Sequence, residues 1–226
     1  MRSNKILVIS DTHLSKHFDP DKFELLKKLI LESDKVIING DFWDSWLTDF
    51  NVFLESKWSM LFPYLLDKKA VYIFGNHDPR PKNDERTNRF SVFNGDSFMM
   101  DSGGSLFRFE HGHKILNSQN HIGMRTYSNI INFSEERNLK VILKLLDGLK
   151  ICGFVLLGPK IMCNSTFSRK RNRLLKNHAK KTWLICGDTH CPEIDNFNKF
   201  ANSGCIINGF CSYLIIEDGK VRLEKI

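Results

Sequence analysis

Five short segments of this chain concentrate side chains that bind metal ions in proteins. Each contains aspartate, histidine or asparagine directly after an apolar run. The segments are SDTH (10–13), GDFWD (40–44), GNHD (75–78), HGH (111–113) and GDTH (187–190). Carboxylate, imidazole and amide ligands together suit Mn, Fe or Zn. Because two such cations held side by side can activate water for attack on a phosphate ester, the segments predict hydrolytic metal chemistry.

The spacing within the segments suggests different roles for their residues. Asp11 and His13 stand two residues apart at a strand end, so both side chains can reach one ion. Asp41 falls at the predicted carboxyl edge of a sheet, and its two oxygens can bridge two cations. Asn76 offers a neutral oxygen, whereas His77 can face a substrate as proton donor. A turn or helix N-cap explains any one segment, but five recurrences after strands favour a metal centre.

The elements that must position these segments follow an alternating order. Apolar runs over 5–10, 35–39 and 70–74 are predicted strands, with helices predicted over 21–33 and 50–66, the latter broken near Pro63. Strand–helix–strand order predicts parallel pairing with helices outside. A polar stretch over 79–94 is predicted to be a loop. Further strands are predicted over 96–101, 106–110, 182–186, 205–208, 213–217 and 221–224.

The 226 residues and 42% hydrophobic content are typical of one globular domain, 1–226. Residues 114–181, the cap segment, differ in character: they show little strand signal and two amphipathic stretches, 139–149 and 169–181. We expect a mostly helical insertion there. No acidic residue occurs between Asp147 and Asp188, where nine of the 33 basic residues lie. The net charge of +7 therefore belongs to the cap segment.

Neither a secretory signal nor a transmembrane segment is predicted from the sequence. The six cysteines form no CxxC pair or zinc-ribbon spacing, which is typical of a reducing compartment. We therefore expect a cytoplasmic protein, with peripheral membrane contact left open by the basic cap segment.

The ordered motifs D-x-H, G-D-x-x-D, G-N-H-D, H-G and G-x-x-H resemble the calcineurin-like metallophosphoesterase superfamily. The resemblance implies an α/β fold in which a β-sandwich is flanked by helices (αββα), with the cap inserted. It implies one metal held by Asp11, His13, Asp41 and His190. It implies a second metal held by Asp41, Asn76, His111 and Asp188, so that Asp41 bridges. By the same resemblance, His77 is the general acid and Asp44 orients it.

One position departs from the family pattern. Asp188 stands where G-H-x-H motifs carry a histidine. A carboxylate can still bind Mn, Fe or Mg, but its charge lowers the net charge of the ligand shell. We expect two divalent ions, foremost Mn²⁺ with Fe, Zn or Mg as alternatives, and a weaker second site.

Within the superfamily, NGDFWDSW (39–46) resembles UDP-2,3-diacylglucosamine pyrophosphohydrolases, which also carry a helical cap. His77 and His113 differ from that branch, which has Arg and Asp at these places. Arg80 is a candidate for binding the substrate phosphate. Basic residues spaced along one helix face could bind phosphates or lipid headgroups, or form a solvated surface, and both interpretations stay open. These are Arg169, Arg173, Lys176 and Lys180.

The sequence therefore predicts a two-metal phosphoesterase acting on a phosphate ester or pyrophosphate, with a phosphorylated small molecule, nucleotide or lipid as substrate. A nuclease or nucleotide phosphodiesterase, gripping nucleic acid through the cap, is the first alternative. A non-catalytic interaction module on the same fold is the second, and Asp188 is its only support.

Overall fold

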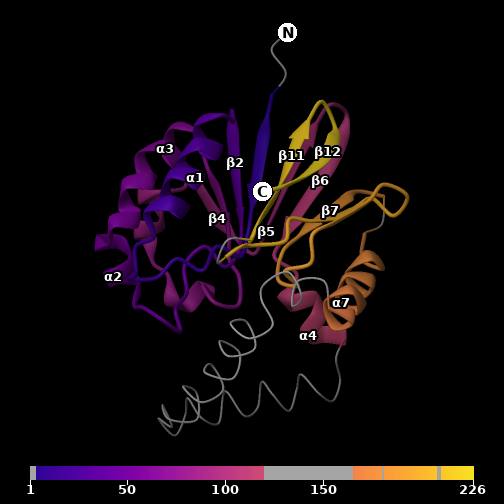
Figure 1. Ribbon diagram of the computed structural model, residues 1–226. Coiled ribbons are helices and arrows are strands. Elements are labelled where there is room, and N and C mark those ends of the chain that lie inside the picture. Colours follow the sequence, from indigo (N-terminus) through magenta and orange to yellow (C-terminus); the bar gives the residue numbers. More distant parts are fainter. Residues whose placement is uncertain (1–3, 120–164, 180, 208–209) are drawn as a thin grey trace, which may run out of the picture.

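The computed structural model describes residues 4–119, 165–179, 181–207 and 210–226. Two β-sheets lie face to face between two groups of helices (Figure 1). The helices α1 and α3 cover one outer face, and α4 and α7 lie on the other side. This α–β–β–α arrangement confirms the predicted fold class.

The first sheet carries the strands that precede the first three motifs. Its strand order is β10-β11-β1-β2-β3-β4, with β12 paired to β11. The strands β1 to β4 run parallel, and β11 is antiparallel to β1. Their bounds are β1 Ile6–Ile9, β2 Lys35–Asn39, β3 Val71–Ile73, β4 Phe93–Gly95, β10 Ile206–Ile207, β11 Phe210–Glu217 and β12 Lys220–Lys225. The carboxyl ends of β1, β2 and β3 therefore meet at one edge.

The second sheet carries the other two motifs. Its order is β5-β6-β7-β9-β8, with β6, β7 and β9 parallel. The bounds are β5 Ser97–Ser102, β6 Ser105–Glu110, β7 Trp183–Cys186, β8 Glu193–Asp195 and β9 Phe200–Asn202. The ends of β6 and β7 thus deliver HGH and GDTH together.

The connecting helices follow the predicted amphipathic stretches with shifted boundaries. Helix α1 (Pro20–Leu31) begins after Asp19, whose side chain accepts from the Lys22 N–H. The predicted helix over 50–66 is three pieces: α2 (Phe50–Glu55), the 3₁₀ helix η1 (Lys57–Leu61) and α3 (Phe62–Asp67). The break falls at Ser56, not near Pro63, because Pro63 occupies the first turn of α3, where its missing N–H costs nothing.

The stretch over 79–94 contains more structure than the predicted loop. Two 3₁₀ helices, η2 (Arg80–Lys82) and η3 (Glu85–Arg89), precede β4. Of the cap segment, the described parts are α4 (His113–Gln119) and α7 (Thr166–Lys176), both helical as expected. The predicted helix over 139–149 lies outside the described residues. No described helix is long and apolar enough to cross a membrane.

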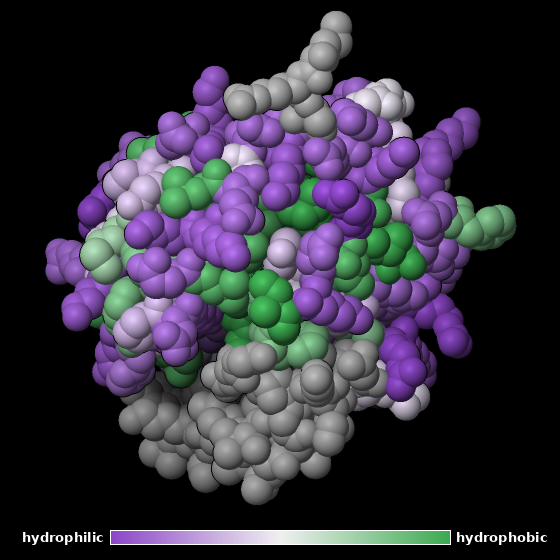
Figure 2. Space-filling view, turned by 45° about the horizontal axis from the view of Figure 1, so that its top comes forward, coloured by the Kyte–Doolittle hydropathy of each residue, from purple (hydrophilic) through white to green (hydrophobic). Residues whose placement is uncertain are grey.

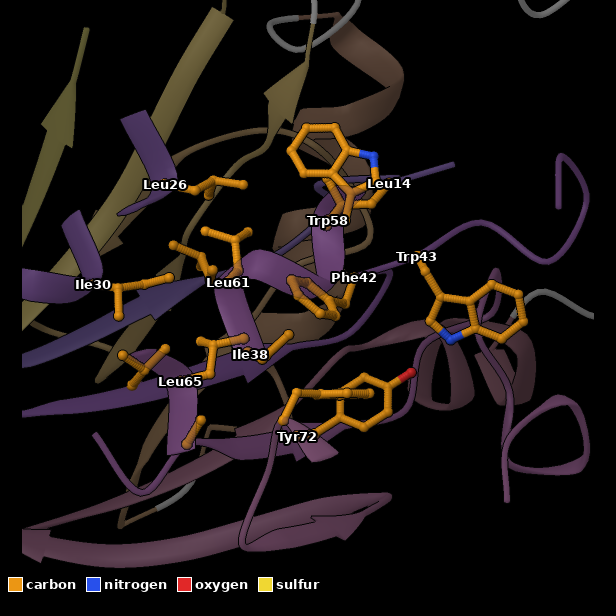
Figure 3. Close-up of a cluster of buried hydrophobic side chains, with 14 of the residues drawn as sticks. Leu14, Leu26, Ile30, Ile38, Phe42, Trp43, Trp58, Leu61, Leu65 and Tyr72 are labelled. Atoms are coloured by element: carbon orange, nitrogen blue, oxygen red, sulfur yellow. The ribbon is translucent and has the colours of Figure 1, made fainter. Parts of the chain in front are cut away.

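Strand residues alternate between two hydrophobic layers. Leu7 and Ile9 face the helices, in the aromatic-rich cluster of Figure 3, where Phe42, Trp43 and Tyr72 pack beside α1 and α3. Ile6 and Val8 face the second sheet instead. A third cluster seats α4 and α7 on the outer face of the second sheet. Its buried members are Leu116, Leu175, Leu184, Cys186 and Phe200.

One buried amide connects the two sheets next to the motifs. Asn39, the last residue of β2, donates from Nδ2 to the carbonyl oxygens of Glu110 (3.2 Å) and Ile185 (3.1 Å). These acceptors belong to β6 and β7. The contact fixes the end of β2 against the ends of the two strands that carry the remaining motifs.

The outer surface is largely hydrophilic, as expected for a chain with 26% charged residues. Figure 2 shows hydrophobic residues gathered near the middle of one face, among hydrophilic ones. Scattered exposed apolar residues such as Val92 and Met99 are ordinary for a protein surface.

Candidate metal centre

The five motifs follow five strand ends, and three of them place aspartate or histidine in a left-handed backbone conformation. Asp11, His13, Asp41, Asp188 and His190 all have φ between 45° and 62°. Non-glycine residues seldom adopt this conformation, and such strain is concentrated at functional sites. Backbone bonds hold it in place, since Asp11 N–H donates to Gly40 O (3.0 Å) and His13 N–H to Asp41 O (3.0 Å).

The buried imidazole of His111 lies at the centre of one group of predicted ligands. Its Nδ1 donates to the Asn39 carbonyl oxygen (2.8 Å), which leaves Nε2 turned toward the motifs. Nε2 lies 3.2 Å from both Asp41 Oδ2 and Asn76 Oδ1, and 3.9 Å from Asp188 Oδ1. The four residues predicted for the second metal therefore converge.

The group predicted for the first metal surrounds Asp11. Its Oδ1 lies 3.1 Å from His190 Nε2, and its Oδ2 accepts from the Asp188 N–H (3.1 Å). His13 Nε2 lies 3.8 Å from Asp41 Oδ2, and the His13 and His190 rings are 5.5 Å apart. Asp41 thus borders both groups.

Asp44 holds two imidazoles with one oxygen. Its Oδ2 lies 3.1 Å from His13 Nδ1 and 3.0 Å from His77 Nδ1. Both rings therefore direct Nε2 away from Asp44, and the Nε2 of His13 lies 3.8 Å from Asp41 Oδ2. The Trp46 ring lies 4.0 Å from the His77 ring and covers one of its faces.

Two glycines allow the motifs to approach this closely. A Cβ on Gly75 would lie 2.1 Å from Asp41 Oδ1, and one on Gly40 would lie 2.3 Å from His111 Nδ1. Both distances are far below van der Waals contact. Glycine at these two positions is therefore required by the packing of the site itself.

The charges in the site are strongly coupled. Burial opposes ionisation of Asp41, but the imidazoles of His111 and His77 outweigh it and hold the pKa of Asp41 well below its ordinary value. His111 is likewise buried, yet Asp41 and Asp11 raise its pKa well above normal. Burial raises the pKa of Asp188, although Arg171 opposes the shift. Three buried carboxylates held this close favour a cationic partner.

The residues fit a pair of divalent ions. Asp11 Oδ1 is fully buried and accepts no well-directed hydrogen bond among the described residues. Asp11, His13 and His190 place one ligand atom each within 4.8 Å of one another, as do Asp11, Asp41 and His111. Mixed oxygen and nitrogen donors of this kind suit Mn, Fe or Zn. His13, Asp41 and His77 form a further group of this kind, so Asp11 and Asp41 each belong to two groups and are placed to serve two neighbouring ions.

A family model for calcineurin-like phosphoesterases matches residues 4–192, which span all five motifs. The chain belongs to the calcineurin-like phosphoesterase family. No curated protein sequence matches the chain. Among solved structures, an archaeal phosphodiesterase is similar over 98% of this chain and 99% of its own, with 15% identity and a TM-score of 0.52. Vps29 of Entamoeba histolytica, solved with zinc, covers 98% of both chains at 15% identity and a TM-score of 0.44.

The predicted substrate-binding cations of this calcineurin-like phosphoesterase lie on η2 and α7. Arg80 is exposed, with its guanidinium 5.6 Å from the Phe74 ring centre. Arg169 and Arg173 are exposed on α7. Together with Lys176 they border a hollow of about 240 Å³ against the chain that follows His190.

Lys176, also predicted to bind substrate, is paired within the protein. Its ammonium group contacts Glu193 and lies 2.8 Å from Asp195, and these hydrogen bonds raise its pKa although burial opposes them. The charge is already matched within the protein. Lys176 therefore anchors α7 to β8, and a substrate would have to compete with two carboxylates for it.

The sequence reasoning overlooked two polar residues that shape the site. Asp78 accepts from the backbone N–H groups of Gly75 (2.7 Å), Asp41 (3.0 Å) and Phe42 (2.7 Å), and so joins two motif loops. Arg171 forms an ion pair with Asp188. The signal for Asp78 was its place at the end of GNHD. Arg171 could have been found from its helical spacing with Ser168, Asn172 and Leu175. These residues share an inward face of the helix, which differs from the predicted basic face.

Proposed function

We propose that the protein is a two-metal phosphoesterase that hydrolyses a phosphate ester or pyrophosphate, with Mn²⁺ as the first metal to test. The observation that carries this proposal is the Asp44–His77 hydrogen bond of 3.0 Å beside the converging carboxylates and imidazoles. A metal-storage or purely structural site has no use for an oriented imidazole next to the ligands. A hydrolytic site requires a proton donor there.

Each group then has a defined task. Bound divalent cations would supply charge neutralisation of the phosphate and activation of the attacking water. Asp44 accepts from Nδ1 of His77 and so fixes the tautomer and direction of its Nε2. From there Nε2 can protonate the leaving oxygen. Trp46 packs on the ring and limits its rotation.

Turnover of bis-p-nitrophenyl phosphate and p-nitrophenyl phosphate with added Mn²⁺ tests the proposal. We expect metal-dependent hydrolysis that EDTA abolishes. Asp41→Asn should remove activity and metal together, because Asp41 borders both ligand groups. Asp67→Asn, which changes an exposed carboxylate paired with Lys68, is the matched control and should behave as wild type. A metal-loaded wild-type protein inert toward all phosphate esters would instead support the non-catalytic interaction module.

The substrate is a separate proposal. A UDP-linked lipid pyrophosphate follows from the resemblance of residues 39–46 to the UDP-2,3-diacylglucosamine pyrophosphohydrolases. Hydrolysis of UDP-2,3-diacylglucosamine at a rate well above that of simple esters would support this branch. Preferential cleavage of single-stranded nucleic acid, with a steep loss at high salt, would favour the nuclease alternative.

A further inference from the structure

Asp188 is not alone at the position where the family pattern has a histidine. Arg171 of α7 bonds to it from Nη2 to Oδ2 at 2.5 Å, while Nη1 lies 3.4 Å from the Asp188 carbonyl oxygen. The two side chains are only 16% and 5% exposed. The other oxygen, Oδ1, lies 3.9 Å from His111 Nε2. One oxygen thus takes the guanidinium and the other faces the predicted second metal position.

This pairing changes the charge balance of the site. Replacing a neutral imidazole by a carboxylate adds one negative charge, and the guanidinium of Arg171 cancels it. The expected weakening of the second metal position by Asp188 therefore loses its electrostatic basis. The pair Arg171–Asp188 presents the same net charge as a neutral histidine, with an oxygen as ligand atom.

The helix that carries Arg171 is fixed to the motif loop. Asn172 donates from Nδ2 to the Cys191 carbonyl oxygen (2.9 Å) and accepts from Thr189 Oγ1 (2.7 Å). Leu175, one turn further on, is buried in the cluster against the second sheet. Arg171 therefore reaches Asp188 from a rigid element, unlike a surface ion pair between two mobile side chains.

We infer that Arg171 is a positioning residue that holds Asp188 as an oxygen ligand of the second divalent cation. The inference rests on the proposed two-metal function and extends it to the cap segment. Partners of this kind orient metal-binding carboxylates and are worth about 10–100-fold in metal affinity. Through Arg171, α7 becomes part of the support of the metal centre.

Calorimetric titration with Mn²⁺, combined with electron paramagnetic resonance of the full chain, tests the inference. We expect Arg171→Gln to keep the first Mn²⁺ but to bind the second about 10–100-fold more weakly, with loss of the spin-coupled signal at two equivalents. The matched control is Lys170→Gln, the exposed neighbouring cation on the same helix, which should bind as wild type. Unchanged or tighter second binding in Arg171→Gln would overturn the inference.

A second pair of variants separates positioning from folding. In an Asp188→His background the guanidinium has no carboxylate to hold, so adding Arg171→Gln should leave the second Mn²⁺ affinity within about twofold. An equal loss in both backgrounds would mean that Arg171 supports only the fold, and would overturn the inference. Fewer than two Mn²⁺ in wild type would overturn the two-metal function as well. If wild type and Arg171→Gln both bind two Mn²⁺ ions with equal affinity, the result would overturn the positioning role alone.

Discussion

At the level of single residues, the site is built around Asp44, whose one oxygen serves two histidines of different purpose. His13 is turned toward Asp41, next to the predicted metal position, whereas the His77 ring packs against Trp46. Burial raises the pKa of Asp44, but the hydrogen bonds from His13 and His77 outweigh it and lower that pKa far below normal. A permanently ionised acceptor keeps both rings in one orientation.

We predict that His77→Gln separates metal binding from proton donation. The variant should retain its Mn²⁺, because neither of the two ligand groups that contain Asp11 includes His77. Turnover of an alkyl phosphodiester should fall by about 10²–10⁴-fold, while p-nitrophenyl esters, whose leaving group needs no proton, should be little affected. The ratio of the two rates is the measurement. An equal loss on both substrates would rule out the general-acid role.

His113 makes the metal-free protein sensitive to acid. Burial, followed by the charge of His111, lowers the pKa of His113 from 6.5 to about 4. Between these values the unfolded chain binds a proton that folded His113 does not, so the free energy of unfolding falls as the pH falls from 6.5 to 4. We predict that His113→Asn removes about 2 kcal/mol of this loss. Urea unfolding of both proteins at pH 4.5 and 7 checks it, and parallel pH profiles would contradict it.

At the level of elements, the strand ends are held together by side-chain acceptors more than by loop length. Asp78 takes three backbone N–H groups from the loops after β2 and β3. Asn202, at the end of β9, accepts from the Gly204 N–H with Oδ1 (2.9 Å) and donates from Nδ2 to Gly187 O (2.7 Å). Buried polar side chains of this sort define the loop shapes that bring the ligands together.

We predict that Asp78→Ala destabilises the protein by about 3–5 kcal/mol, because three buried N–H groups would lose a charged acceptor. The exposed Asp67→Ala should change stability by about 0.5 kcal/mol or less. Urea denaturation with Mn²⁺ absent measures both. A loss of similar size in the two variants would show that Asp78 does not hold the loops.

The sequence predicts the strands with long apolar runs better than it predicts the short strands. Long apolar runs gave β1, β2 and β7 within a residue or two, because burial on both faces leaves an unmistakable pattern. The three-residue strands β4, β8 and β9 are too short to show a hydrophobic period, and β4 and β9 are set by pairing with β3 and β7, which local pattern does not encode. Arg171 was overlooked because its partner, Asp188, lies 17 residues further along the chain, beyond β7.

At the level of the whole molecule, the centre lies where two sheets end side by side, so ligands come from both. Asp11, Asp41 and Asn76 follow strands of the first sheet, and His111 and Asp188 follow strands of the second. Carboxylates from two sheets repel one another across this junction when no cation is bound. Metal binding should therefore stabilise the whole fold and not only the loops.

We predict that Mn²⁺ at about 100 times its dissociation constant raises the free energy of unfolding by about 2.7 kcal/mol per site. For a chain of this size that corresponds to an increase of about 5–10 °C in Tm per site. Calorimetry with Mn²⁺ against EDTA gives the value. Asp41→Asn should show no such response, and an equal Tm with and without metal in the wild type would contradict the prediction.

The Asn39 amide, which donates to β6 and β7 at once, has a consequence for turnover. Sliding one sheet over the other would break both hydrogen bonds in a place that water does not reach. Opening and closing of the candidate site by relative motion of the two layers is therefore disfavoured. If the protein is the phosphoesterase proposed above, we expect substrate to enter and product to leave through movements of side chains and loops around a stationary framework, and we expect the speed of those local motions to limit turnover.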